Sequence, residues 1–184
     1  IILDFGDKIC YNIVNYSKCA HTVSIIFRKS KDTHKGDSKM INIAIMGFGV
    51  VGSGVAETIR LNNEAFAKRM EGVTLNVKYI LDLREFPDHP LGDRVVHEIT
   101  PILEGKDVTI VVETMGGTVP AYDFSKKAIL AGKSVVTSNK EVVAKHGAEL
   151  QRLARENGVS YLFEASVGGG IPIIRPMWQC LASN

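Results

Sequence analysis

The chain has few cysteines, and their arrangement argues against a disulfide scaffold or a cysteine-ligated metal centre. Only three occur among 184 residues, namely Cys10, Cys19 and Cys180. Their odd number does not suggest a disulfide framework, and their spacing matches no metal-ligand pattern. Reduced thiols are typical of cytosolic proteins, so we expect a cytoplasmic location.

Long apolar runs and an excess of one charge are also lacking. No apolar run approaches the ~20 residues of a membrane span, which argues against a membrane partner. The formal net charge of +2 is too small to predict binding to nucleic acid. With 45% hydrophobic and 23% charged residues, the chain can bury a globular core. Its length suits one domain, or one domain plus part of another.

The most informative stretch is 41–54, which reads I-N-I-A-I-M-G-F-G-V-V-G-S-G. An apolar run ends in Gly47, Gly49 and Gly52, spaced G-x-G-x-x-G, and a helix-compatible segment follows. The first glycine permits a tight turn, the second lets the backbone approach a pyrophosphate, and the third lets the helix pack close to the strand. The helix N-terminus then favours the phosphates. We predict a dinucleotide site; the alternative is a structural glycine turn without a ligand.

A second strand is predicted over 73–82 from its β-branched and aromatic content. In a dinucleotide fold an acid at the end of this strand accepts hydrogen bonds from the ribose hydroxyls of NAD, whereas a nearby arginine accommodates the phosphate of NADP. The sequence has Asp82 and, two positions on, Arg84. Cofactor preference therefore stays open between NAD and NADP. The alternative reading of both residues is an exposed loop pair.

The next segments predict further strands with ligand-facing ends. Residues 85–107 read as an irregular connection with at most short helical turns. Residues 108–113 have the near-continuous β-branched run of a buried parallel strand, and T-M-G-G follows from Thr114. Small residues at the carboxyl end of a central strand leave room for a ligand. A plain turn is the competing account.

The pattern then predicts a helix over 121–131, a short strand over 134–138 and an amphipathic helix over 141–157. Lys140 lies between the last two. A lysine at the carboxyl end of a parallel strand faces the cleft, where its ammonium can contact a nicotinamide ribose or a substrate carboxylate. A solvated lysine at a helix start is the plainer interpretation.

Beyond a further strand at 159–164, the stretch 165–172 is too glycine-rich for a helix or strand interior. Exposed carbonyls with one carboxylate suit a hard cation or a polar ligand, and a hinge between two domains is the alternative. Residues 173–181 read as the opening of a helix. The whole pattern predicts an α/β fold, a Rossmann-type doubly wound and mostly parallel sheet, with the start of a second domain at the C-terminus.

Four motifs in this order resemble homoserine dehydrogenase: I-M-G-F-G-V-V-G at 45–52, V-V-E-T-M-G-G at 111–117, V-V-T-S-N-K at 135–140 and F-E-A-S-V-G-G-G-I-P-I-I at 163–174. The resemblance implies NAD(P)-dependent interconversion of L-homoserine and L-aspartate 4-semialdehyde, on the route to threonine, methionine and isoleucine. Other dehydrogenases of amino acids or semialdehydes on the same fold, and a non-catalytic NAD-sensing module, are the alternatives.

The resemblance also assigns roles to single residues. It implies that Phe48, Val50 and Val51 line the dinucleotide, and that Lys140 sits by the nicotinamide end and the substrate as a supporting residue. It implies a structural sodium ion, with backbone carbonyls as the main ligands, at Glu164, Val167, Gly169 and Ile171.

The family's substrate domain, which supplies the catalytic lysine proton donor, follows the G-G-G-I-P segment. We therefore expect 40–164 to be the NAD(P)-binding domain and 165–184 to be a hinge and the beginning of the substrate domain. The fragment is expected to be inactive alone, and the full-length enzyme to be a homo-oligomer. Residues 1–39 read as translated upstream sequence before a start at Met40; an N-terminal extension packed on the domain is the alternative.

Overall fold

The computed structural model describes residues 40–69, 72–168, 171 and 173–181, so the prediction for 1–39 lies outside the described residues. The elements in chain order are β1 (Met40–Met46), α2 (Val50–Arg69), β2 (Thr74–Leu81), η1 (Gly92–Arg94), β3 (Val95–Val96), α3 (Thr100–Glu104), β4 (Val108–Glu113), α4 (Val119–Leu130), β5 (Ser134–Thr137), α5 (Lys140–Glu156), β6 (Tyr161–Leu162), η2 (Glu164–Ser166) and α6 (Ile174–Leu181).

The strands form one parallel sheet in the order β3-β2-β1-β4-β5-β6. This order and the parallel pairing confirm the predicted Rossmann-type α/β fold. The chain reverses its direction across the sheet between β1 and β4, which lie side by side. Ligands of open parallel sheets bind at such a switch point, outside the carboxyl ends of the strands.

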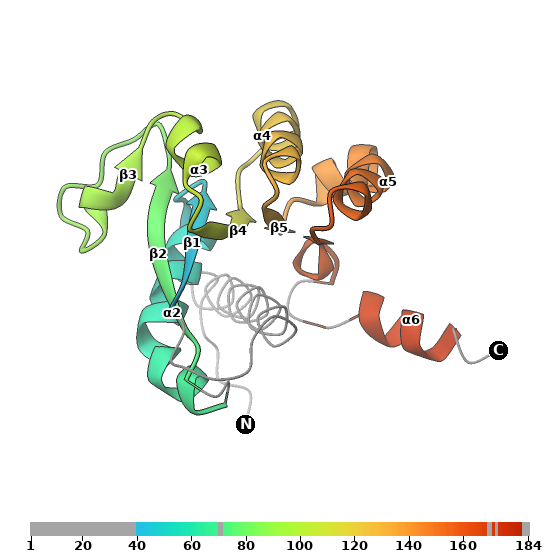
Figure 1. Ribbon diagram of the computed structural model, residues 1–184, viewed down its shortest axis with the longest axis horizontal. Helices are drawn as coiled ribbons and strands as arrows, with labels where there is room; N and C mark the ends of the chain where they lie inside the picture. The colour runs from blue at the N-terminus through green and yellow to red at the C-terminus, as the bar shows by residue number, and fades with distance from the viewer. Residues whose placement is uncertain (1–39, 70–71, 169–170, 172, 182–184) are drawn as a thin grey trace, which may run out of the picture.

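Helices cover both faces of the sheet. Figure 1 shows α3, α4 and α5 over one face and α2 on the other. Successive side chains of β1 point to opposite faces of the sheet. Ile43 and Ile45 pack with Val55 of α2, whereas Ala44 and Met46 belong to the cluster under α3, α4 and α5. Every residue of β4 except Thr109 is buried, because both faces of a doubly wound sheet are covered.

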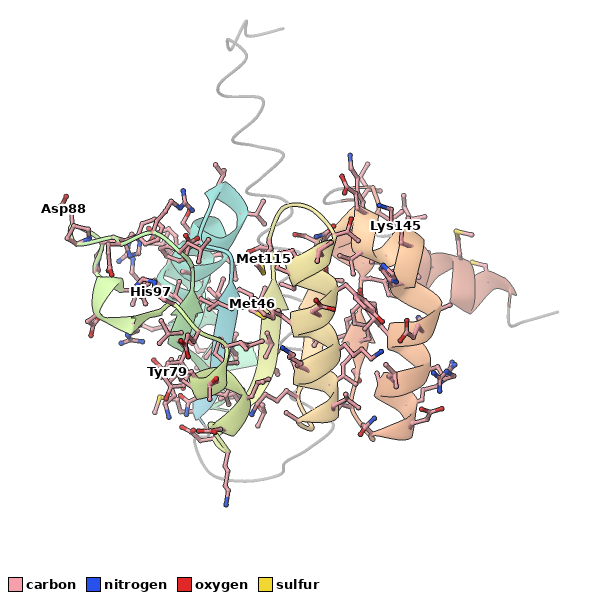
Figure 2. All side chains as sticks on the ribbon, turned by 90° about the horizontal axis from the view of Figure 1, so that it is seen from above. Met46, Tyr79, Asp88, His97, Met115 and Lys145 are labelled. Carbon is pink, nitrogen blue, oxygen red and sulfur yellow. The ribbon has the colours of Figure 1, made fainter. Side chains whose placement is uncertain are left out.

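Two strand predictions need correction. The connection 85–107 contains β3, a two-residue strand that pairs with Ile80 and Leu81 of β2 and is too short to show an alternating pattern. The strand predicted over 159–164 is only Tyr161–Leu162, because Glu164 has already entered the η2 turn. The connection between β2 and α3 extends outward from the edge of the sheet, where Figure 2 labels Asp88 and His97. None of the described helices has the length and apolar character needed to cross a membrane.

Candidate dinucleotide-binding site

The glycine turn joins β1 to α2, and the backbone is tightly packed at Gly47 and Gly52. A Cβ on Gly52 would lie 2.0 Å from the carbonyl oxygen of Gly47, so α2 can approach the turn this closely only with glycine there. Gly47 has a φ of +89°, which side chains rarely adopt, and a Cβ there would be 3.0 Å from the Cα of Met115. The backbone of the turn is therefore packed against the end of β1 and the loop after β4.

Gly49, in contrast, has open space where a side chain would be. A Cβ on Gly49 would meet no atom within 4 Å, and the residue lies immediately before the first turn of α2. Space at a helix N-terminus, lined by backbone rather than by a side chain, suits the close approach of a phosphate. Val50, the next residue, is exposed, and Val51 is half-buried.

Thr114 holds the turn from the neighbouring strand. Its backbone N–H donates to the carbonyl of Met46 at 2.9 Å, and its hydroxyl donates to the carbonyl of Gly47 at 2.7 Å. Figure 2 labels Met46, the last residue of β1, and Met115, which follows Thr114 in the loop after β4. Thr114 thus supports the glycine turn through hydrogen bonds within the protein.

Phe48 contributes its backbone to the turn and its ring to the core. The ring is buried and meets Phe86 and His89 edge-to-face, with centroids 5.1 and 5.0 Å apart. Its N–H donates to Asp82 Oδ2 at 2.7 Å. These contacts fasten the loop after β2 to the glycine turn, an attachment that has no signal in the sequence because the partners are 34 or more residues apart.

The carboxylate of Asp82 is fully engaged by the protein. Oδ1 accepts hydrogen bonds from Arg84 N and Nε at 3.0 and 2.9 Å, and Oδ2 accepts from Phe48 N and from a terminal guanidinium nitrogen of Arg84 at 2.7 and 3.0 Å. The Arg84 guanidinium, with help from the two backbone amides, lowers the pKa of Asp82 to about 2. The Arg84 side chain is 62% exposed, and its guanidinium lies 5.1 Å from the centre of the Phe86 ring.

The other side of the site is the turn between β5 and α5. Asn139 is the N-cap of α5: its Oδ1 accepts from Glu141 N and Val142 N at 3.1 and 3.2 Å. Its amide nitrogen donates to the carbonyls of Met115 and Gly117 at 3.2 and 2.7 Å. Lys140 follows as the first residue of α5 and is exposed, and no hydrogen bond or ion pair joins its ammonium to another described residue. The lysine is therefore available to a ligand.

Glu113 belongs to this region and was not predicted from the sequence. It ends β4 with a fully buried side chain that accepts hydrogen bonds from the hydroxyl of Thr137 and from Met115 N, the latter at 2.8 Å. Burial raises the pKa of its carboxyl, and the hydrogen bonds from Thr137, Met115 and Asn139 oppose that rise. The available signal was an acid that ends an otherwise apolar strand, V-T-I-V-V-E.

The raised pKa of Glu113 makes stability depend on pH in a defined direction. The folded state holds the proton of the Glu113 carboxyl more tightly than the unfolded chain does. The stabilisation that this gives to the folded state is full below about pH 4.5 and is lost as pH rises through the folded-state pKa. Glu113→Gln stays neutral throughout. The free energy of unfolding of Glu113→Gln, minus that of the parent, should therefore grow by ~1.4 kcal/mol per pH unit between pH 4.5 and the folded-state pKa of Glu113.

Urea unfolding at a series of pH values measures this difference. The matched control is Glu149→Gln, because Lys126 lowers the pKa of that half-buried carboxyl and no such growth is expected. A difference for Glu113→Gln that stays flat above pH 4.5 would contradict the prediction.

The glycine-rich loop predicted to bind sodium is only partly described. Glu164 Oε1 accepts hydrogen bonds from the backbone N–H groups of Ile173 and Ile174 at 2.6 and 2.8 Å, at the start of α6. Val167 is half-buried, Ile171 is exposed, and Gly169 lies outside the described residues. In the part of the chain that the structure describes, no three His, Cys, Asp or Glu side chains gather as a metal site. The sodium site stays a prediction.

The predicted dinucleotide residues thus gather at the carboxyl ends of β1, β2, β4 and β5. The N-terminus of α2 follows the glycine turn, the Asp82–Arg84 pair lies at the end of β2, and Lys140 lies just beyond the end of β5. In known dinucleotide-binding folds of this type, the pyrophosphate lies at the first of these places and the adenine ribose at the second. The fold and the site define a Rossmann-type NAD(P)-binding domain.

Comparison with known proteins identifies the family. The model described as "Homoserine dehydrogenase, NAD binding domain" matches residues 47–164. The homoserine dehydrogenases of Mycobacterium bovis and Neisseria gonorrhoeae are 39% and 38% identical to the chain, over 150 and 148 residues. The chain belongs to the homoserine dehydrogenase family.

Solved structures agree with this assignment. Homoserine dehydrogenase from Thiobacillus denitrificans superposes with a TM-score of 0.70 at 34% identity, over 79% of this chain and 34% of that one. A hyperthermophilic archaeal homoserine dehydrogenase in complex with NADPH gives a TM-score of 0.60 at 31% identity, over 74% of this chain and 47% of that one. The matches to the two bacterial relatives cover 81% and 79% of this chain, which spans about a third of their length, 34% in each case.

Proposed function

We propose that this chain supplies the dinucleotide half of a homoserine dehydrogenase, the NAD(P)-dependent enzyme that interconverts L-homoserine and L-aspartate 4-semialdehyde. The observation that carries the proposal is the open space over Gly49 at the N-terminus of α2, in a chain of this family. Residues 40–164 form the dinucleotide domain in this proposal, and 165–184 form the hinge and the beginning of the substrate domain. Assembly into a homo-oligomer is part of the same proposal.

The chemistry requires a hydride carrier and a second reactant held in contact. The bound dinucleotide supplies or accepts the hydride. The residues of this chain bind and orient it: the glycine turn holds the pyrophosphate, and the Lys140 ammonium holds the nicotinamide ribose or the substrate carboxylate. Lys140 is thus a supporting residue, and the principal proton donor belongs to the family's substrate domain.

Isothermal titration of the chain with NADPH and with NADH tests the dinucleotide half directly. Saturable binding of either compound supports the proposal, and a folded sample that binds neither would overturn it. Oxidation of homoserine by a full-length enzyme carrying this domain separates a dehydrogenase from a non-catalytic sensing module, because a sensing module binds the dinucleotide without turnover.

The geometry at the end of β2 favours NADP(H) over NAD(H). A carboxylate has about four lone-pair positions for hydrogen bonds, and Asp82 already accepts four from Arg84 and Phe48. Ribose hydroxyls would have to displace these donors. The exposed guanidinium of Arg84, in contrast, is available to a ribose phosphate, for which arginine is well suited.

Arg84→Ala should therefore change cofactor preference. We expect the affinity for NADPH to fall by ~10- to 100-fold, because a charge-assisted hydrogen bond contributes ~1.5–3 kcal/mol. The affinity for NADH should hold or improve, since the change frees Asp82 for the ribose hydroxyls. Isothermal titration with both compounds measures the two affinities.

Arg60→Ala is the matched control, because Arg60 is an equally exposed arginine whose guanidinium pairs with Glu57 on the outer side of α2. That variant should bind both compounds as the parent does. Equal losses for NADPH and NADH in Arg84→Ala would show that Arg84 does not select the phosphate.

A further inference from the structure

A buried hydrogen-bond cluster lies behind the ligand-facing turns, and the chemistry above makes no use of it. Its centre is Glu113, whose carboxylate accepts from the hydroxyl of Thr137 and from Met115 N at 2.8 Å. Both Glu113 and Thr137 are fully buried. One carboxylate thus joins the last residues of two neighbouring strands, β4 and β5.

The cluster continues into the turn that carries Lys140. Thr137 Oγ1 accepts a hydrogen bond from Asn139 N at 2.9 Å, and the Asn139 amide donates to the carbonyls of Met115 and Gly117. Since Asn139 is the N-cap of α5 and Lys140 is its first residue, these bonds determine where the lysine leaves the backbone.

Other contacts hold the glycine turn. Thr114 donates its hydroxyl hydrogen bond to Gly47 O at 2.7 Å, and Asp82 accepts from Phe48 N at the same distance. Neither contact includes the Glu113 carboxylate. Loss of the Glu113 cluster should therefore disturb the Lys140 side of the site more than the pyrophosphate and adenine side, which Glu113 reaches through its bond to Met115 N beside Gly47.

We propose that Glu113 is a positioning residue, whose buried carboxylate sets the turn between β5 and α5 and so brings Lys140 to the nicotinamide end of the dinucleotide. This inference rests on the proposed function. A merely structural role, in which Glu113 only joins β4 to β5, would weaken the binding of every ligand alike.

Ligands of two lengths distinguish these roles. NADPH reaches the nicotinamide end, whereas adenosine 2′,5′-bisphosphate lacks the nicotinamide and its ribose. We expect Glu113→Ala to lower the affinity for NADPH about tenfold, the usual effect of losing one hydrogen bond to a charged group. The affinity for the bisphosphate should change by less than about twofold. NADH and ADP form the equivalent pair if the chain prefers NADH.

Two further variants test the proposal even if Glu113→Ala does not fold. Thr137→Val preserves the size and branching of the side chain while it removes the hydroxyl between Glu113 and Asn139, so it should give the same split between the two ligands. Glu113→Gln keeps an acceptor for Met115 N and should restore part of the NADPH affinity. Glu149→Gln is the control and should change neither affinity, because this α5 carboxylate bonds to Lys126 and Tyr122 of α4, away from the cluster.

A double-mutant cycle with Lys140→Ala completes the experiment, because coupled residues give non-additive effects. If Glu113 acts through Lys140, Thr137→Val and Glu113→Ala lose their effect on NADPH affinity once Lys140 is alanine. Equal losses for the long and short ligands, or effects that add to that of Lys140→Ala, would overturn the inference while leaving the proposed function intact. A parent chain that binds neither NADPH nor NADH would overturn both.

Discussion

Gly52→Ala should abolish dinucleotide binding and destabilise the fold. The added Cβ would lie 2.0 Å from Gly47 O and 2.9 Å from Thr114 Oγ1, and the first of these is backbone that cannot rotate away. Either α2 must shift from the turn or the turn must open, and both movements disrupt the pyrophosphate site. Overpacking of this kind costs on the order of 3 kcal/mol. Urea unfolding and titration with NADPH measure the two effects.

Gly49→Ala is the matched control, three residues away in the same turn. Its Cβ would meet no protein atom within 4 Å, and Gly49 does not adopt the left-handed conformation that only glycine tolerates well. Stability should therefore hold or rise slightly, by ~0.4–1 kcal/mol. Dinucleotide affinity should nevertheless fall, because the methyl group occupies the space over the turn. A Gly49→Ala chain that binds NADPH normally would refute the assignment of this space to the pyrophosphate.

Lys140→Ala in a full-length enzyme carrying this domain should lower kcat/KM strongly, by about 100-fold or more, with little change in the free energy of unfolding. The ammonium is exposed and bonded to no described residue, so the fold does not depend on it. Its loss removes a charged contact to the nicotinamide ribose or the substrate, and misplaced reactants lose rate steeply. Steady-state kinetics with homoserine, beside thermal unfolding, provide the measurement.

Lys145→Ala serves as the comparison for that experiment. This lysine lies on the same helix, and its ammonium is 3.4 Å from the hydroxyl of Thr118. Figure 2 labels it on α5. Its replacement should leave kcat/KM close to that of the parent. Unchanged kinetics in Lys140→Ala would remove the proposed role of this residue.

The predicted helices and strands that agree best with the structure are those whose sequence patterns lie within the element itself. The glycine spacing at 47, 49 and 52 predicted a strand, a turn and a helix, and the structure places β1 and α2 there. The β-branched run at 108–113 became β4 without a shift of boundary. Short pieces such as β3 and β6 were missed or lengthened, because two residues paired at a sheet edge carry no periodicity.

Within the site, the sequence determined which residues have suitable chemistry, and the tertiary structure decided which groups each of them contacts. Residue type and spacing predicted Gly49, Asp82 and Lys140 as candidates, and the structure places each of them after a strand end. Spacing carries no information on which donors reach the carboxylate of Asp82. Only the folded chain brings Phe48 N to it, across 34 residues.

Glu113 shows the same division most clearly. In the sequence, Glu113 is only a polar residue that ends an apolar strand. Its hydrogen-bond partner Thr137 is 24 residues away, so nothing local indicates their contact. Parallel pairing of β4 with β5 aligns these two residues in register and buries them together. Hydrogen bonding and burial at such a point are properties of the packed sheet. Local sequence therefore determined the strands and helices, while long-range packing decided which side chains meet and which are buried.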